Sequence, residues 1–272
     1  MARNPSPSDP PHPSVPLVDT HAHLADPDFA RDMAGVLARA RAAGVGRILV
    51  IGTTAEDSEQ AVAIAREHPG LHASVGIHPN HAAEAVEGDW ERVVALAGDP
   101  LVVAIGETGL DRYWDKTPCA LQQEMFDRHL DLSEELGKPV VIHARESLDD
   151  ILEQLRRRAR PIRGVMHSFT GDRDQAAAFL DLGLYLSFAG MITFKNKGLD
   201  PLREAAAAAP ADRILVETDC PYLSPEPFRG RPNEPARVAW TARKVAQLRG
   251  TTLDELAAQT SANAAQLFQL PA

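Results

Sequence analysis

The chain has 272 residues, of which 44% are hydrophobic and 24% charged, and its formal net charge at pH 7 is −10. This composition is typical of a globular protein, and no apolar run approaches the ~20 residues that span a bilayer. Two cysteines are too few for a disulfide framework, which favours a reducing, cytoplasmic location. The negative balance argues against broad electrostatic binding of duplex nucleic acid. A polyanionic substrate would need local attraction from metal ions or a few placed cations.

The first segment, residues 1–15, reads MARNPSPSDPPHPSV and is rich in proline and serine. It lacks the continuous apolar stretch of a signal peptide. We expect residues 1–15 to form a disordered tail and residues 16–272 to form a single domain. Nothing in the sequence indicates assembly, so we expect a monomer.

Eight short apolar runs rich in valine and isoleucine follow, and they read as buried strands. They cover residues 16–23, 47–52, 72–78, 101–107, 139–145, 163–169, 184–190 and 213–219. Successive runs start roughly 20 to 40 residues apart, which is close to the size of a strand plus a crossover helix.

Helical patterns lie between these runs, over residues 29–44, 55–70, 119–137 and 147–160, and two more helices, around 235–248 and 253–267, close the chain. In the first pattern Phe29, Met33 and Leu37 share one stripe, and Gly44 suits a C-terminal cap. Alternating strands and helices predict a parallel sheet, and eight such units predict an α/β protein with a (β/α)8 TIM barrel. A doubly wound open sheet is the alternative, but no GxGxxG motif follows the first run.

Ionisable residues stand where the predicted strands end. These ends meet on one rim of a barrel, where barrel active sites lie. The residues are His21, His23, His78, Glu107, His143, His167, Glu217 and Asp219. One histidine at a strand end is usually a hydrogen-bonded structural residue, but burying this many ionisable groups without a partner is costly. Because a metal ion offsets that cost, we expect a metal site.

Six of these residues are candidate metal ligands: His21, His23, Glu107, His143, His167 and Asp219. One zinc ion is satisfied by about four ligands, so six suit two divalent ions bridged by a carboxylate and a water. Glu107, midway round the barrel, is the natural bridge. Nitrogen and oxygen ligands without thiolate suit Zn, Mn or Ni, and a carboxylate-rich half could hold Mg. Cys220 adjoins Asp219 but should face the other way, as a small buried thiol.

The motifs DTHAHL, GIHP, GETGLD, VIHAR, HSFTG, FKN, ETDCPYL and RGRPNEP occur in this order. They resemble the TatD family of metal-dependent deoxyribonucleases, within the wider amidohydrolase-like superfamily, over nearly the whole chain after the tail. The resemblance implies a TIM barrel with a divalent metal centre that hydrolyses phosphodiester bonds, typically trimming DNA from a 3′ end.

The resemblance also implies roles for individual residues. His21 and His23 would hold one metal, His143 and His167 the second, Glu107 would bridge them and Asp219 would complete the site. Glu217 would support the site or orient a water, and Asp111 of the GLD motif would fix a loop. Asp19 shares the parity of His21 and His23 but lies deeper, so we expect it to orient a ligand imidazole. The family often has a second histidine directly after GIHP. Asn80 stands there in this chain, which puts a substrate contact near His78 in question.

The expected reaction is metal-dependent hydrolysis of DNA at single-stranded or frayed ends. Two metals would activate a water and neutralise the phosphoryl oxygens. Asp219 or Glu217 would accept the proton, so the expected catalytic residues are these two and Glu107. Positive charge for the substrate would come from five rim residues, His78, Arg112, Arg145, Lys195 and Arg229, and bases could stack on Tyr222 and Phe169.

Two alternatives stay open at this point. The first is an amidohydrolase-type enzyme that acts on a small ester, lactone or amide. Many such barrels bridge their metals with a carboxylated lysine, whereas the fourth run here offers Glu107. The second is a non-catalytic barrel that serves as a scaffold. Such a protein would be expected to have lost ligands, and none of the six is missing.

Overall fold

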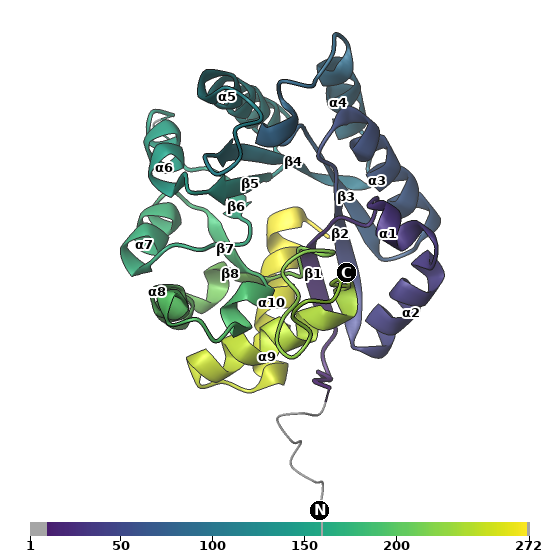
Figure 1. Cartoon of the computed structure of the whole chain (residues 1–272), viewed down its shortest axis with the longest axis vertical. Helices are drawn as coiled ribbons and strands as arrows, with labels where there is room; N and C mark the ends of the chain where they lie inside the picture. Colours follow the sequence, from purple (N-terminus) through teal and green to yellow (C-terminus); the bar gives the residue numbers. More distant parts are fainter. Residues whose placement is uncertain (1–9, 159, 271–272) are drawn as a thin grey trace, which may run out of the picture.

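A computed structural model describes residues 10–158 and 160–270 of the chain. Eight parallel strands form its centre, with helices around them (Figure 1). The strands are β1 (Leu17–Ala22), β2 (Val45–Ile51), β3 (Leu71–Val75), β4 (Val102–Asp111), β5 (Val140–Arg145), β6 (Gly164–Met166), β7 (Tyr185–Phe188) and β8 (Ile214–Val216). They are neighbours in chain order, and a parallel bridge joins Ala22 to Cys220, just after β8. This confirms the (β/α)8 TIM barrel and excludes the open doubly wound sheet.

The helices follow the predicted pattern with some differences. They are α1 (Pro27–Ala30), α2 (Met33–Ala42), α3 (Ala55–Glu67), α4 (Asp89–Ala97), α5 (Cys119–Leu136), α6 (Leu148–Arg156), α7 (Arg173–Asp181), α8 (Asp200–Ala208), α9 (Val238–Arg249) and α10 (Leu253–Phe268). The helix expected over 29–44 is two helices, because Asp26 caps α1 through Asp28 N and the chain turns before Met33. Short 3-10 turns also occur, among them η1 (Pro79–His81) and η5 (Pro235–Arg237).

Apolar side chains form two packed layers. One lies between the outer faces of the strands and the surrounding helices. The other fills the barrel with strand residues such as Val18, Leu49 and Val141, and with Leu267 and Phe268 of α10. The amino-terminal end of the barrel is therefore closed by hydrophobic packing. Polar side chains are left to the carboxyl-terminal end.

The segment before β1 is only partly within the described residues, since residues 1–9 of the expected tail lie outside them. Ser14 donates hydrogen bonds of 2.7 Å from both its N and its Oγ to the carboxylate of Asp254, at the start of α10. Residues 14–16 thus approach the barrel beside α10. Within residues 10–158 and 160–270, no helix is both long and apolar enough to cross a membrane.

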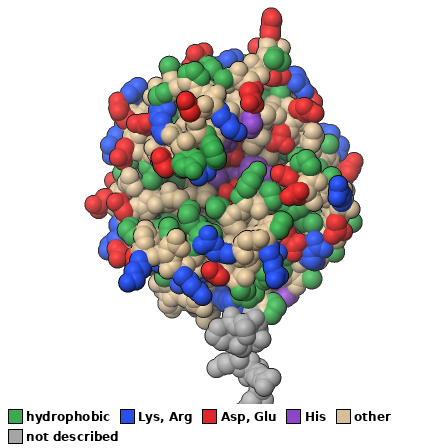
Figure 2. Space-filling view, in the orientation of Figure 1, with side chains coloured by type: hydrophobic (Ala, Val, Ile, Leu, Met, Phe, Trp, Pro, Cys, Tyr) green, Lys and Arg blue, Asp and Glu red, His purple; other side chains and the backbone are tan. Residues whose placement is uncertain are grey.

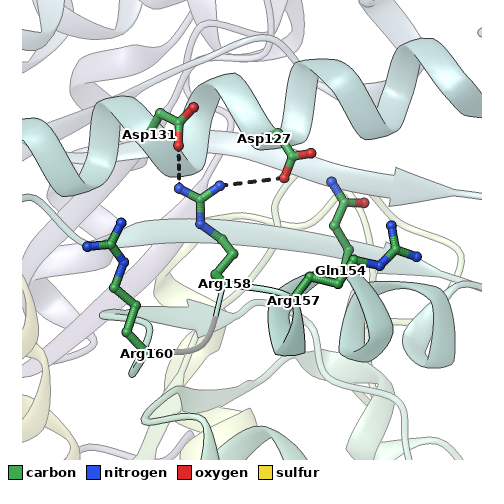
Figure 3. Close-up of a pocket in the computed structure, with 6 residues that line it drawn as sticks. All are labelled: Asp127, Asp131, Gln154, Arg157, Arg158 and Arg160. Atoms are coloured by element: carbon green, nitrogen blue, oxygen red, sulfur yellow. Dashed lines mark hydrogen bonds and ion pairs between the residues drawn. The ribbon is translucent and has the colours of Figure 1, made fainter.

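A surface hollow lies between α5 and α6, and its polar lining is largely paired (Figure 3). Arg158 contacts Asp127 at 3.6 Å and also pairs with Asp131, while Arg157 pairs with Glu153. Because each cation meets a carboxylate at the protein surface, the hollow is an ion-paired junction between two helices.

Candidate metal centre

The first candidate ligands stand at the end of β1, after an irregularity in its pairing. The register against β2 shifts between Asp19 and Ala22, so side-chain alternation does not continue from Asp19 to His21. His21 and His23 still converge, with their Nε2 atoms 3.2 Å apart. Asp19 instead accepts hydrogen bonds from Thr218 N at 2.8 Å and Thr218 Oγ1 at 2.6 Å. The expectation that Asp19 orients an imidazole is wrong: its carboxylate ties β1 to the segment after β8.

Glu107 is brought into the barrel by a second irregularity, in β4. The register of β4 against β5 shifts between Ile105 and Thr108. Gly106 has φ +133°, and a Cβ there would lie 2.6 Å from the carbonyl oxygen of Val141. Only glycine fits such a position without strain. The Glu107 side chain is 3% exposed and lies among the histidines.

One oxygen of Glu107 faces the first cluster, which we define as His21, His23 and Asp219. Glu107 Oε2 is 3.3 Å from His21 Nε2 and 3.7 Å from His23 Nε2. Asp219 Oδ1 lies 3.3 Å from His23 Nε2 and 3.8 Å from His21 Nε2. Two imidazoles and two carboxylates therefore surround one point.

The other oxygen of Glu107 faces the second cluster, which we define as His78, His143 and His167. Glu107 Oε1 is 2.9 Å from His143 Nδ1, 2.9 Å from His167 Nε2 and 3.5 Å from His78 Nε2. Burial alone would raise the pKa of Glu107, but the imidazoles of His167, His78 and His21 hold it well below its usual range. Glu107 is thus an ionised carboxylate whose two oxygens serve different clusters.

The donor atoms of both clusters fit a divalent cation. In each cluster two imidazole nitrogens face each other, His21 and His23 at 3.2 Å and His143 and His167 at 3.3 Å, and both nitrogens also face an oxygen of Glu107. A tetrahedral ion with bonds of ~2.1 Å would hold its ligand atoms about 3.4 Å apart. One proton shared between the two nitrogens leaves the facing Glu107 oxygen without a donor, whereas a cation contacts all three atoms. Figure 2 shows histidine side chains within a hollow near the middle of the face in view.

Asp111, at the end of β4, orients one imidazole of the second cluster. Its Oδ2 is 3.0 Å from His143 Nε2 and accepts from Asn80 Nδ2 at 3.0 Å. Its Oδ1 accepts from the backbone N of Tyr113 at 2.9 Å and of Trp114 at 3.0 Å. Since a carboxylate only accepts, His143 Nε2 carries a proton, and with a metal ion bound Nδ1 would offer its lone pair to that ion. Asp111 fixes the loop, as the resemblance implies, and it also fixes a tautomer.

Asn80 therefore has a defined place, although it departs from the usual family pattern. Besides contacting Asp111, its backbone N donates to His78 Nδ1 at 3.1 Å. This bond leaves the proton of a neutral His78 on Nε2, toward Glu107. Burial lowers the pKa of His78 to about 4, so the ring is neutral at pH 7.

Glu217 lies beneath the clusters and is held by two contacts. Its Oε1 accepts from Ser168 N at 2.7 Å and is 3.2 Å from His167 Nδ1, and the residue is 1% exposed. Ser168 (φ +43°) directly follows the candidate ligand His167, and Asp219 (φ +55°) is itself a candidate ligand. Both residues adopt the left-handed region. Such backbone strain clusters at functional sites.

Two cations predicted to contact substrate are engaged with neighbouring side chains. Arg112 Nε donates to Asp150 of α6 at 2.7 Å. Arg145 places its guanidinium carbon 3.9 Å from the ring centre of Tyr113. Neither contact involves a cluster residue.

The other predicted substrate contacts lie in loops after β7 and β8. Lys195 and Arg229 are exposed, and the Arg229 guanidinium carbon is 3.8 Å from the ring centre of Phe194. Tyr222 is 57% exposed, with its ring centre 5.9 Å from that of His23. Phe169 is 2% exposed and packs against other phenylalanines, so the expectation that it stacks on bases is wrong.

Sequence reasoning missed the contact of Asp111 with His143 and the exposure of Tyr113 and Trp114. The spacing contained a signal for the contact of Asp111 with His143. Asp111 follows Glu107 by four residues on the same strand, and residues an even number apart on a strand point to the same face. Cys220 is buried, as predicted.

A (β/α)8 barrel with histidine and carboxylate clusters at the carboxyl ends of its strands defines a metal-dependent hydrolase of the amidohydrolase-like fold. The family model described as TatD related DNase matches residues 18–269, and the chain belongs to this family.

Among its relatives, the uncharacterized metal-dependent hydrolase YabD of Bacillus subtilis is 39% identical over 93% of this chain and 99% of its own. The 3'-5' ssDNA/RNA exonuclease TatD of Klebsiella pneumoniae is 39% identical, over 93% of this chain and 97% of its own.

Among solved structures, the TatD homologue YJJV of Escherichia coli superposes with a TM-score of 0.88 at 33% identity, covering 94% of this chain and 98% of its own. A beta-aspartyl dipeptidase of Fervidobacterium islandicum shares the fold alone, with 15% identity and a TM-score of 0.64 over 94% of this chain and 74% of its own.

Proposed function

We propose that this protein is a metal-dependent nuclease that removes nucleotides from the 3′ ends of single-stranded or frayed DNA. The observation that carries the proposal is that Glu107 faces both clusters, with Oε2 toward the first and Oε1 toward the second. A bridging carboxylate between two nitrogen-rich clusters is suited to an anionic ester, because two cations counter the charge on the phosphoryl oxygens. Relatives named as 3'-5' ssDNA/RNA exonucleases support this choice of substrate.

Two divalent cations, Zn, Mg or Mn, would be held by these residues. His21, His23 and Asp219 would hold one, His143 and His167 the other, and Glu107 would contact both. When bound, such ions act as Lewis acids and make hydroxide available near neutral pH.

Asp219 is the better placed of the two candidate proton acceptors. Its side chain is 13% exposed and lies at the edge of the first cluster. Glu217 is buried, and its Oε1 is taken up by Ser168 N and His167. We therefore assign Asp219 to proton transfer at the attacking oxygen, and Glu217 to holding His167 in place.

His78 is suited to donating a hydrogen bond to the substrate. It is neutral at pH 7, and its Nε2 lies 3.5 Å from Glu107 Oε1, a long hydrogen bond. A phosphoryl oxygen closer to Nε2 would be a better-placed acceptor than Glu107. Lys195 and Arg229 are exposed and would contact the DNA backbone. Arg112 is paired with Asp150 and would contribute less.

The test is hydrolysis of a single-stranded oligonucleotide labelled at its 5′ end, with added Mg, Mn or Zn. We expect a ladder of products shortened from the 3′ end, and we expect it to disappear with a chelator or with Glu107→Ala. Leu136→Ala, at the end of α5 and away from the clusters, is the matched control and should cleave like the wild type. Absence of products from the wild type, or equal cleavage by Glu107→Ala, would contradict the proposal. Hydrolysis of lactones or cyclic amides alone would assign the site to small substrates.

A further inference from the structure

All exposed aromatic side chains of the described residues lie in loops that follow β4 and β8, at the carboxyl end of the barrel. They are Tyr113 at 49% exposure, Trp114 at 47% and Tyr222 at 57%. Tyr222 flanks His23 of the first cluster. Tyr113 and Trp114 follow Asp111, the residue that orients His143 of the second cluster. Exposing large aromatic rings in water is unfavourable, so their restriction to this rim indicates a binding role.

Tyr113, Trp114 and Arg145 form a compact unit, which we call the aromatic platform. The guanidinium carbon of Arg145 lies 3.9 Å from the Tyr113 ring centre and 5.6 Å from that of Trp114. Trp114 stands edge-on to Tyr113, with the ring centres 4.8 Å apart and the planes at 90°. Arg145 thus occupies a face of Tyr113, and the half-exposed indole of Trp114 is the surface left for a ligand.

The platform is fixed relative to the second cluster through one carboxylate. Asp111 Oδ1 holds the backbone N of both Tyr113 and Trp114, while Asp111 Oδ2 holds His143 Nε2. Arg145 is also the last residue of β5, two positions after His143. A ligand on Trp114 would therefore be linked to the candidate metal ligand His143 through the buried residue Asp111.

Charge favours an anionic ligand at this place. No ion pair joins Arg145 to a carboxylate among the described residues, although the chain carries a net charge of −10. Lys116 Nζ lies 5.9 Å from the Trp114 ring centre and adds a second cation. A flat apolar surface beside two cations matches a nucleotide, which joins an aromatic base to a phosphate.

We propose that Trp114 stacks on a base of the DNA strand near the scissile phosphate, and that Arg145 neutralises an adjoining phosphate. This inference rests on the proposed nuclease function and extends it to substrate recognition. Every base has an aromatic face, so the platform binds single strands with little sequence preference. It also favours frayed ends, because a paired base is already stacked within its duplex.

The test compares binding of two phosphorothioate oligothymidylates, which resist cleavage, to the metal-loaded protein. One is intact and the other is abasic near its 3′ end. We expect Trp114→Ala to weaken binding of the intact strand by about 5- to 100-fold, the range for loss of one base–aromatic stack, and to leave the abasic strand unaffected. We expect Trp114→Phe to retain most of the affinity. The intact strand should change the tryptophan fluorescence of the wild type, and this change should be lost in Trp114→Phe.

Two results would overturn the proposal that Trp114 stacks on a base. One is equal affinity of Trp114→Ala and the wild type for the intact strand. The other is an equal loss of affinity of Trp114→Ala for both strands. Leu136→Ala is again the control and should bind both strands like the wild type. Failure of the nuclease function would be seen separately, as no cleavage of an ordinary oligonucleotide by the wild type. Loss of the binding preference for the intact strand in Trp114→Ala, with the wild-type affinity for the abasic strand kept, would support the platform.

Discussion

Replacing Asp111 with asparagine should weaken metal binding without removing a metal ligand. Asp111 receives four hydrogen bonds, two on each oxygen. If the amide oxygen of Asp111→Asn takes the two backbone donors, its NH2 group faces the N–H groups of His143 and Asn80. His143 relieves this contact by moving its proton to Nδ1. Its lone pair then no longer points into the second cluster.

The magnitude follows from the loss of one oriented ligand. Residues that orient a metal-binding imidazole change metal affinity by roughly 10- to 100-fold, or about 1.4–2.7 kcal/mol. We expect a loss of this size in one of two binding steps when Mn or Zn is titrated calorimetrically or against a chelating dye. The step assigned to the first cluster should change little, because Asp111 contacts none of its residues.

Asp150→Asn is the matched control, since Asp150 is an acidic residue of the same rim that pairs with Arg112. It should bind metals like the wild type. The nitrogen chemical shifts of His143 in the zinc-loaded protein give a second measurement, because they distinguish the two tautomers. The reasoning is refuted if Asp111→Asn keeps both wild-type affinities, or if it loses affinity while His143 keeps the wild-type tautomer.

Three further predictions concern folding and the loop after β3. Burial lowers the pKa of His129 to about 4, below its unfolded value of ~6.5, so its stabilising effect is full above pH 6.5 and is lost as the pH falls. His129 should contribute roughly 2 kcal/mol less to stability at about pH 4.5 than at pH 7, and urea unfolding of His129→Gln should lack this part of the wild-type pH dependence. Gly106→Ala should cost about 3 kcal/mol or more, because its Cβ would meet Val141 O at 2.6 Å and φ is +133°. Gly198→Ala, which has open space and ordinary φ, should change the unfolding free energy little in the same assay. Asn80→Ala removes one of the four bonds to the Asp111 carboxylate, and a metal titration should show a smaller loss than with Asp111→Asn.

The sequence was sufficient for the order of the strands and for the convergence of the candidate ligands. Both follow from simple rules: apolar runs separated by helical patterns form parallel strands, and the carboxyl ends of barrel strands share one rim. The side chains of His21, His143 and His167 meet there because each stands near the carboxyl end of its strand. Glu107 joins them from within β4, which continues to Asp111 and does not end at residue 107 as expected.

Alternation along a strand was a less reliable guide, because it assumes an unbroken register. The shift after Asp19 separates that residue from the imidazoles it was expected to orient. Phe169 was placed at the rim by its position after His167, but Ser168 adopts a left-handed conformation between them, and Phe169 lies in the core. Bulges and left-handed residues redirect side chains, and the apolar pattern does not reveal them.

The sequence by itself determined which residue types arrive at the rim, since the residue that follows each apolar run is a local property of the chain. Only the tertiary structure decided how they act together. Three features depend on distances between different strands and loops. They are the contacts of Glu107 with both clusters, the contact of Asp111 with His143 Nε2 and the exposure of Trp114. Such distances are fixed only when the barrel closes and its irregular strands pack against their neighbours. They therefore cannot be predicted from any single segment of the chain.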